Sequence, residues 1–251
     1  MVNYWSHIDS DLIDGPTSQA IDEAILKARL KDLVLDTLHL YRRISPTISI
    51  GRYQKIDEVV DLNYCREQGI DVIRRASGGG AIYTDSNCLE YTIVVDQQYS
   101  MIPPDLEGSF KAICTGIVIA LKKLGIKAVY KPINDVVIRG RKISGSAQKR
   151  RRVLLQHGTL LVDADFRSMS RALKIGSALT LMKKLTTVKR EAPRVYSFGE
   201  IKEALKTGFE ESLSMKVVTQ RLKHWEKEEI KVLTDKYKSK SWVFPDLACS
   251  Q

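Results

Sequence analysis

The sequence predicts an α+β domain: a mixed β-sheet flanked by helices, followed by a short helical C-terminal appendage. Helix-like and strand-like periodicities alternate over the first 165 residues. The chain has 251 residues, 43% of them hydrophobic, which is enough to bury a sizeable core. Beyond residue 165 the segments become short, basic and rich in turns. We therefore expect a main domain over residues 1–194 and a helical extension over 195–251 that packs on it.

The first half of the chain begins with a helix over residues 16–30. Pro16 suits an early helical position, and Ala20, Ala24 and Leu30 contribute to one apolar face. A short helix is expected over 57–69, ended by Gly69. Strand-like runs surround it, at 38–43, 46–51, 71–75, 81–84 and 89–95.

The second half begins with a strongly apolar helix over 106–124, ended by Gly125. Three strands are expected after it, at 126–131, 135–140 and 153–165, with a further strand that starts near Lys142. The pattern Ser197-x-x-Glu200 is a capping box and marks a later helix start. The last helix is expected over about 219–238.

The charge raises the question of nucleic acid, because Lys and Arg exceed Asp and Glu by ten. Residues 139–152 hold seven Lys and Arg and no acidic residue. The positive charge is concentrated in this one run and is not spread over several segments, as a nucleic-acid-binding surface would require. The run also contains no aromatic side chain to stack on bases. A nucleic-acid-binding module therefore remains a remote alternative, and nucleic acid an unlikely partner.

Three features that the sequence lacks bear on the cellular location of the protein. No apolar run reaches the ~18–20 residues that cross a bilayer, so no membrane partner is expected. The sequence does not begin with basic residues followed by an apolar stretch, so it shows no sign of a secretory leader. The scattered cysteines form no CxxC pair, which argues against a zinc site or a disulfide framework and favours a cytoplasmic location. They are Cys65, Cys88, Cys114 and Cys249.

The first candidate site is the segment RRASGGGAIYTD at residues 74–85, between two expected strands. Three successive glycines let a ligand approach the backbone amides closely. Arg74 and Arg75 add planar cations suited to carboxylate or phosphate. The spacing fits neither a dinucleotide-binding nor a P-loop motif. A hairpin turn with surface arginines is the plain alternative, but the combination favours a cradle for an anionic ligand.

The second candidate site is NDVVIRGRKISGSAQ at residues 134–148. Lys142 could neutralise charge on a carbonyl or phosphate oxygen, and Asp135 could hold a divalent metal or orient that lysine. Taken alone, GRK is more often an ordinary hairpin turn with a solvated lysine. A third candidate is His157 in an apolar strand, where a lone histidine is more often a satisfied core residue than a catalyst.

Together, RRASGGGAIYTD and NDVVIRGRKISGSAQKRRRVLLQHGTLLVD resemble the lipoate-protein ligase family, within the biotin and lipoyl ligase superfamily. The similarity runs from about Asp14 to Asp163 and more weakly into the tail. It implies a sheet and helices related to class II synthetase catalytic domains, and a catalytic main domain. It also implies that ATP activates lipoate as lipoyl-AMP, and that a lysine of a lipoyl-domain protein then attacks the acyl carbon.

The resemblance also implies roles for individual residues. Lys142 matches the essential lysine, and Asp135 a possible Mg²⁺ ligand, with no tightly bound metal expected. His157 matches a strand position beside the acyl pocket. The lipoyl-adenylate would contact Arg75, Ser77, Gly78, Gly79, Gly80, Ala81, Ile82, Tyr83, Asn134 and His157.

Two departures from the family pattern shape the expected function. Related octanoyltransferases that form a thioester have a cysteine in the loop before the strand leading to this lysine, and AVYKPINDVVIRGRK has none. This disfavours acyl-enzyme chemistry. Larger ligases carry an accessory domain that is missing here, so a separate accessory polypeptide is a possible partner.

The expected function is an ATP- and Mg²⁺-dependent lipoate-protein ligase. The expected acceptors are lipoyl domains of the 2-oxoacid dehydrogenase E2 or glycine cleavage H protein type. The first alternative is transfer of an octanoyl or lipoyl group from a carrier protein without ATP.

Overall fold

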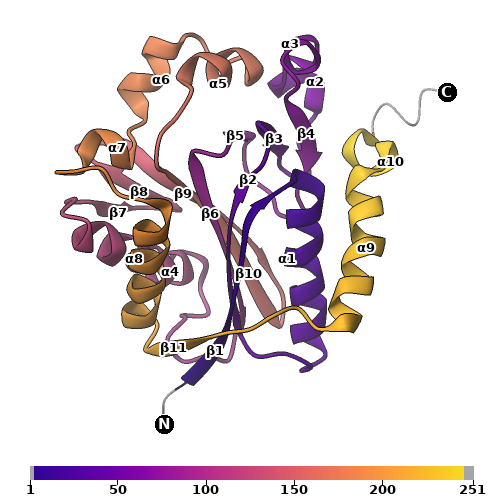
Figure 1. Cartoon of the computed structure of the whole chain (residues 1–251), viewed down its shortest axis with the longest axis vertical. Helices are drawn as coiled ribbons and strands as arrows, with labels where there is room; N and C mark the ends of the chain where they lie inside the picture. Colours follow the sequence, from indigo (N-terminus) through magenta and orange to yellow (C-terminus); the bar gives the residue numbers. More distant parts are fainter. Residues whose placement is uncertain (1–2, 246–251) are drawn as a thin grey trace.

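The computed structural model describes residues 3–245 and is built on one eight-stranded mixed sheet (Figure 1). The first strand pairs in parallel with both of its neighbours, and the other pairs are antiparallel. Across the sheet the order is β11 (Met215–Thr219), β1 (Asn3–Ile13), β2 (Thr37–Arg43), β6 (Cys88–Asp96), β10 (Val153–Leu161), β9 (Arg141–Arg150), β8 (Asp135–Ile138) and β7 (Val129–Lys131).

Helices cover both faces of this sheet (Figure 1). On one face, α4 (Leu106–Lys123) and α8 (Phe198–Ser212) pack on each other and on the strands in the largest apolar cluster. On the other face, α1 (Gly15–Leu30) lies between the sheet and α9 (His224–Lys238), around a separate cluster. The α+β fold expected from the sequence is confirmed.

A small second sheet lies beside one end of the main sheet, in the order β4 (Asp71–Arg74), β3 (Thr47–Ile50) and β5 (Ile82–Thr84). The expected helix over 57–69 is broken in two, α2 (Ile56–Val59) and α3 (Leu62–Glu67). Val60 is extended and 1% exposed, because it fills the core beneath this small sheet. Two short helices, α5 (Phe166–Ala172) and α6 (Ala178–Lys184), close the same region. The short helix α7 (Val188–Glu191) packs on the main core instead, through Val188.

The extension expected over 195–251 differs from the structure in two respects. The helix α8 begins at the predicted capping box of Ser197 and Glu200, but its apolar face completes the main core rather than an appendage. The strand β11 extends the main sheet, where the sequence predicted only helices. The reason is that α8 must bury Ile201, Leu205 and Phe209, and α4 offers the matching face.

Within residues 3–245, α9 and α10 (Lys240–Val243) form a layer outside α1 (Figure 1). Trp242 fixes this segment, because its indole nitrogen donates to the carbonyl of Arg74 at 2.8 Å. Residues 246–251, including Cys249, lie outside the described part of the chain. Within residues 3–245 no helix has the length and apolarity needed to span a bilayer.

Candidate active site

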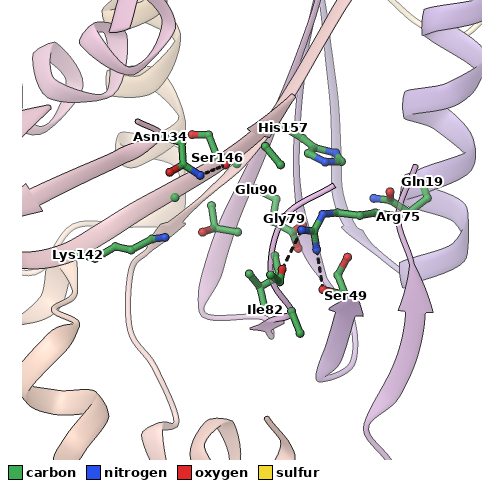
Figure 2. Close-up of a pocket in the computed structure, with 16 residues that line it drawn as sticks. Gln19, Ser49, Arg75, Gly79, Ile82, Glu90, Asn134, Lys142, Ser146 and His157 are labelled. Atoms are coloured by element: carbon green, nitrogen blue, oxygen red, sulfur yellow. Dashed lines mark hydrogen bonds between the residues drawn. The ribbon is translucent and has the colours of Figure 1, made fainter. Parts of the chain in front are cut away.

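A cavity of about 190 Å³ opens between the glycine segment and strands β9 and β10 (Figure 2). Arg75 and Gly79 lie on one side, and Lys142 points into the space from the opposite side. The lining contains both motifs found in the sequence, although about 60 residues separate them. It comprises Gln19, Ser49, Arg75, Gly79–Ile82, Glu90, Asn134, Lys142, Gly145–Ala147 and His157–Thr159.

The glycine segment connects β4 to β5 and takes a backbone course that needs glycine. Gly79 has φ of +91°, a conformation that side chains disfavour. At the end of β3, a Cβ on Gly51 would collide with the carbonyl oxygen of Gly79. The segment can therefore lie against the small sheet only because both positions lack a side chain.

Arg75 holds this segment in shape. Its Nη2 donates to the carbonyls of Gly78 at 2.7 Å and Gly80 at 2.8 Å. Nε donates to the Ser77 hydroxyl and Nη1 to the Ser49 carbonyl, so four of the five N–H donors of the guanidinium are engaged. Desolvation by burial lowers the pKa of Arg75 to about 10, against the opposing field of Glu90. The arginine thus both lines the cavity and shapes the glycine segment.

Lys142 follows the turn between β8 and β9, and its ammonium pairs with Asp135 Oδ1 at 2.6 Å. Gly145 makes room for this pair, because a Cβ there would collide with Nζ of Lys142. The lysine side chain is 38% exposed, so the charge remains accessible to a ligand. This ion pair is the geometry that the predicted orienting role of Asp135 would need.

The other predicted role of Asp135, as a metal ligand, has no further support in the described residues. No group of three or more His, Cys, Asp or Glu side chains that could hold a metal is found among residues 3–245. The donors present therefore do not form a protein cage for Mg²⁺.

The structure brings most of the predicted site residues together. Eight of them line the cavity: Arg75, Gly79, Gly80, Ala81, Ile82, Asn134, Lys142 and His157. Gly78 lines a neighbouring cavity of about 220 Å³, and Tyr83 a second of about 240 Å³. Ser77 is 2% exposed and lies behind the wall. Asn134 donates from Nδ2 to the Ser146 carbonyl at 2.6 Å, so the first residue of the second motif is hydrogen-bonded to β9.

Some lining residues were not predicted. Thr159 lies two positions from His157 on the same strand face, so the period of two could have identified it. Glu90 interrupts an apolar strand, and it pairs with buried Arg43 at 2.7 Å. Gln19 and Ser49 carry no local signal, since they reach the cavity only through the packing of α1 and β3 on the main sheet.

None of the described cysteines lines the cavity. Cys65, Cys88 and Cys114 are buried free thiols. Burial raises the pKa of Cys114 to about 11 and raises that of Cys88 well above its ordinary value, so both stay protonated at neutral pH. Within residues 3–245, no thiol meets the requirements of a nucleophile at this site.

The basic run at 139–152 is largely used within the fold. Arg139 and Arg141 pair with Glu191, and Lys142 with Asp135. Arg150 donates to Ser109 Oγ and to two carbonyls at the start of α4.

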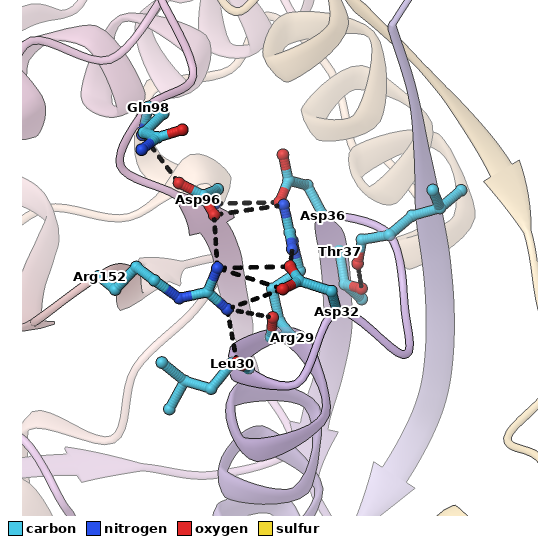
Figure 3. A network of polar contacts seen from close by, with 9 residues as sticks. Arg29, Leu30, Asp32, Asp36, Thr37, Asp96, Gln98 and Arg152 are labelled. Atoms are coloured by element: carbon cyan, nitrogen blue, oxygen red, sulfur yellow. Dashed lines mark hydrogen bonds and ion pairs between the residues drawn. The ribbon is translucent and has the colours of Figure 1, made fainter.

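At the end of the run, Arg152 joins a network of exposed and half-buried charges (Figure 3). It contacts Asp32 at 3.2 Å and Asp96 at 3.6 Å, and Arg29 pairs with the same two carboxylates and with Asp36. Five of the seven cations of the run therefore have protein partners, which leaves little of it for a phosphate backbone.

The fold and the pocket together define a catalytic domain of the lipoate-ligase type. The family model described as the lipoyl protein ligase A/B catalytic domain matches residues 14–210. The chain belongs to this family, and the resemblance found in the sequence is confirmed.

Curated relatives cover almost the whole chain. A protein named octanoyltransferase LipM from Carboxydothermus hydrogenoformans is 31% identical over 265 residues, spanning 96% of this chain and 98% of that protein. Another of the same name from Staphylococcus aureus is 25% identical, spanning 97% and 99%. These names fit the carrier-protein alternative better than the expected ATP-dependent ligase.

Solved structures support the fold independently. A lipoate-protein ligase A bound with ATP superposes with a TM-score of 0.84 at 26% identity, covering 96% of this chain and 98% of that one. A bi-partite lipoate protein ligase from Thermoplasma acidophilum, described together with its E2 lipoyl domain, gives 0.84 at 27% identity, covering 97% and 96%.

Proposed function

We propose that this chain transfers an octanoyl or lipoyl group to a lysine of a lipoyl-domain protein. The observation that carries this proposal is the cavity itself, where Lys142 faces the glycine segment held by Arg75 (Figure 2). Backbone amides and a fixed cation suit the oxygen of an activated acyl group, where negative charge develops as an amine attacks. The acceptor would be of the 2-oxoacid dehydrogenase E2 or glycine cleavage H protein type, and the reaction would take place in the cytoplasm.

The first candidate donor is an octanoyl thioester on a carrier protein. The names of the curated relatives support it. Because no described cysteine lines the cavity, the acyl group would pass directly to the acceptor. The lysine amine would form the C–N bond of the amide as the C–S bond breaks, and the departing thiolate would take up the proton that the amine loses.

The second candidate donor is lipoyl-AMP, made in the same cavity from lipoate and ATP. Two observations favour it: the structural likeness to a ligase bound with ATP, and the lack of a described thiol for acyl-enzyme chemistry. Here the lysine amine would form the C–N bond of the amide as the C–O bond to AMP breaks, and the proton that the amine loses would pass to the departing phosphate or to solvent. The likeness to a bi-partite ligase supports the further proposal that a separate accessory polypeptide assists the activation.

One experiment separates the donors. The purified chain is incubated with a lipoyl domain and one of two donors. The first donor is octanoyl carrier protein, and the second is lipoate together with ATP and Mg²⁺. The mass of the intact lipoyl domain is then measured by mass spectrometry. Acylation only from the carrier protein assigns the transferase. Acylation only with ATP, accompanied by pyrophosphate release, assigns the ligase. A domain left unmodified by both donors, and by preformed lipoyl-AMP, would overturn the proposed function.

Replacing Lys142 by alanine is expected to reduce acylation from the active donor by about 10²–10³-fold, because a charge-stabilising group is lost from a preorganised site. Circular dichroism and the unfolding midpoint should stay near native, since the lysine is half-exposed. Lys111→Ala, an exposed position on α4, is the matched control. Near-native turnover by Lys142→Ala would remove this lysine from the mechanism.

A further inference from the structure

We propose that Asp22 is a positioning residue for this site: acting through His157 and Ser77, it fixes the direction of the hydrogen bonds that shape the glycine segment. This deepens the proposed function and rests on it. Asp22 lies on α1, is 2% exposed, and is not among the residues that line the cavity. Its influence on the ligand must therefore pass through its neighbours.

The Asp22 carboxylate is held in place from two strands. The Thr92 hydroxyl on β6 donates to Oδ2 at 2.8 Å, and His39 Nδ1 on β2 lies 2.9 Å from Oδ1. His39 in turn has its other nitrogen 2.9 Å from the Ser10 hydroxyl. Burial opposes ionisation of Asp22, but the nearby rings of His157 and His39 outweigh it and lower the pKa to about 2. The carboxylate is therefore a fixed negative charge at neutral pH.

His157 connects this charge to the glycine segment. Its Nδ1 faces Asp22 Oδ2 at 3.7 Å, and its Nε2 lies 2.5 Å from the Ser77 hydroxyl. Both ring nitrogens are thus directed at protein groups although the residue lines the cavity. A histidine so engaged does not offer a nitrogen to the ligand, and its part in the site is to hold Ser77.

The contacts from Arg75 through Ser77 and His157 to Asp22 form a chain of polar groups. The direction of donation along this chain follows from which groups can only donate and which can only accept. Arg75 Nε donates to Ser77 Oγ at 3.1 Å, and the carboxylate of Asp22 can only accept. The negative charge beside Nδ1 favours a proton on that nitrogen. Nε2 is then the acceptor for the Ser77 hydroxyl proton, and the chain runs in one direction from Arg75 to Asp22.

At its other end this chain sets the shape of the cavity wall. Arg75 also donates to the carbonyls on either side of Gly79. A guanidinium is planar, so its orientation at Nε fixes the orientation of Nη2 as well. Displacement of a positioned group by about 1 Å can cost 10²-fold in rate, so Asp22 can control transfer without contacting the ligand.

The test is Asp22→Asn, which preserves size and still offers an oxygen to His39. Its amide would place donors toward Thr92 and His157, so His157 would move its proton to Nε2 and donate to Ser77. We expect ¹⁵N-edited NMR to find the His157 proton on Nδ1 in the native protein and on Nε2 in the variant. We also expect the amide signals of residues 78–80 to shift, and kcat for transfer to fall at least tenfold with an unchanged KM for the acceptor domain.

Thr92→Val is the matched control, because it removes another hydrogen bond to Asp22 but leaves the carboxylate charge and the contact of His157 with Ser77 in place. It is expected to lower the unfolding midpoint without moving the glycine amide signals or kcat. Ser77→Ala should reproduce the kinetic loss, and the double variant with Asp22→Asn should be no worse than either single one.

An Asp22→Asn protein with native kcat and native glycine signals would overturn the proposal, as would additive losses in the double variant. If this variant does not fold, the native protein still decides, since a His157 proton on Nε2 contradicts the chain. The NMR measurements need no substrate. Failure of the native chain to acylate any acceptor would therefore overturn the proposed function. The position of the His157 proton and the glycine amide signals would still test the role of Asp22 on their own.

Discussion

Gly79 has the backbone conformation that makes the glycine segment a cradle, and it gives the sharpest prediction for a single residue. A side chain there meets both an unfavourable φ and Arg75 Nη2 at 3.0 Å. Gly79→Val should therefore abolish calorimetric binding of the acyl substrate, lipoate with ATP or an octanoyl thioester. Gly78→Ala, where a Cβ meets open space, should bind normally. Normal binding by Gly79→Val would make this segment a simple turn.

Asp22 predicts how stability depends on pH. Its pKa is about 2 in the folded protein and 3.8 when unperturbed, so folding favours its ionised form. The resulting stabilisation, on the order of 2 kcal/mol, is complete above about pH 4 and is lost as the pH falls toward 2. Urea unfolding of the native protein should therefore weaken more steeply over this range than that of Asp22→Asn. Parallel curves would contradict the assignment.

At the scale of elements, the contact between α4 and α8 depends on two glycines. A Cβ on Gly116 would lie 2.5 Å from the Phe209 ring, and one on Gly208 would collide with the Gly116 carbonyl. Gly208→Ala should therefore destabilise the fold by about 1–3 kcal/mol in urea unfolding, despite the better helix propensity of alanine.

Gly199→Ala, on the exposed first turn of the same helix, is the control for that substitution. Its Cβ would meet only the Ser197 hydroxyl at 3.9 Å, so this change should leave stability unchanged or raise it. An equal effect at both positions would mean that the two helices are not packed as closely as described.

Local signals predicted the elements well wherever the determinants are local. The capping box at Ser197, the turn at Gly125 and the alternation around His157 each act within a few residues. Strands β1 and β11 were missed because each is defined by a partner far along the chain, which no window of sequence contains. For the same reason the sequence supplied Lys142 and the glycine segment but not Asp22, whose role depends on three strands that meet at α1.

At the scale of the whole molecule, activation and transfer place different demands on the chain. Transfer needs only a bound adenylate and the acceptor lysine, whereas activation needs ATP held in line with the carboxylate. Residues 195–245 supply a helix and a strand of the main domain and an outer helical layer, but no second core.

If the adenylate is the donor, the single chain should therefore use preformed lipoyl-AMP readily and form it from ATP slowly without a partner protein. Parallel rates from lipoyl-AMP and from lipoate with ATP measure this difference. Equal and fast rates would refute the requirement for a partner.

The pairing of β1 with β11 also bears on how the protein is made. Asn3 lies opposite Met215, so during synthesis β1 must wait for a strand about 200 residues later. At the usual pace of synthesis, this leaves the outer edge of β1 uncovered for roughly 10–40 s. Until then Trp5 and its neighbours present an open strand edge to other nascent chains, which makes β1 a segment that needs a chaperone during synthesis.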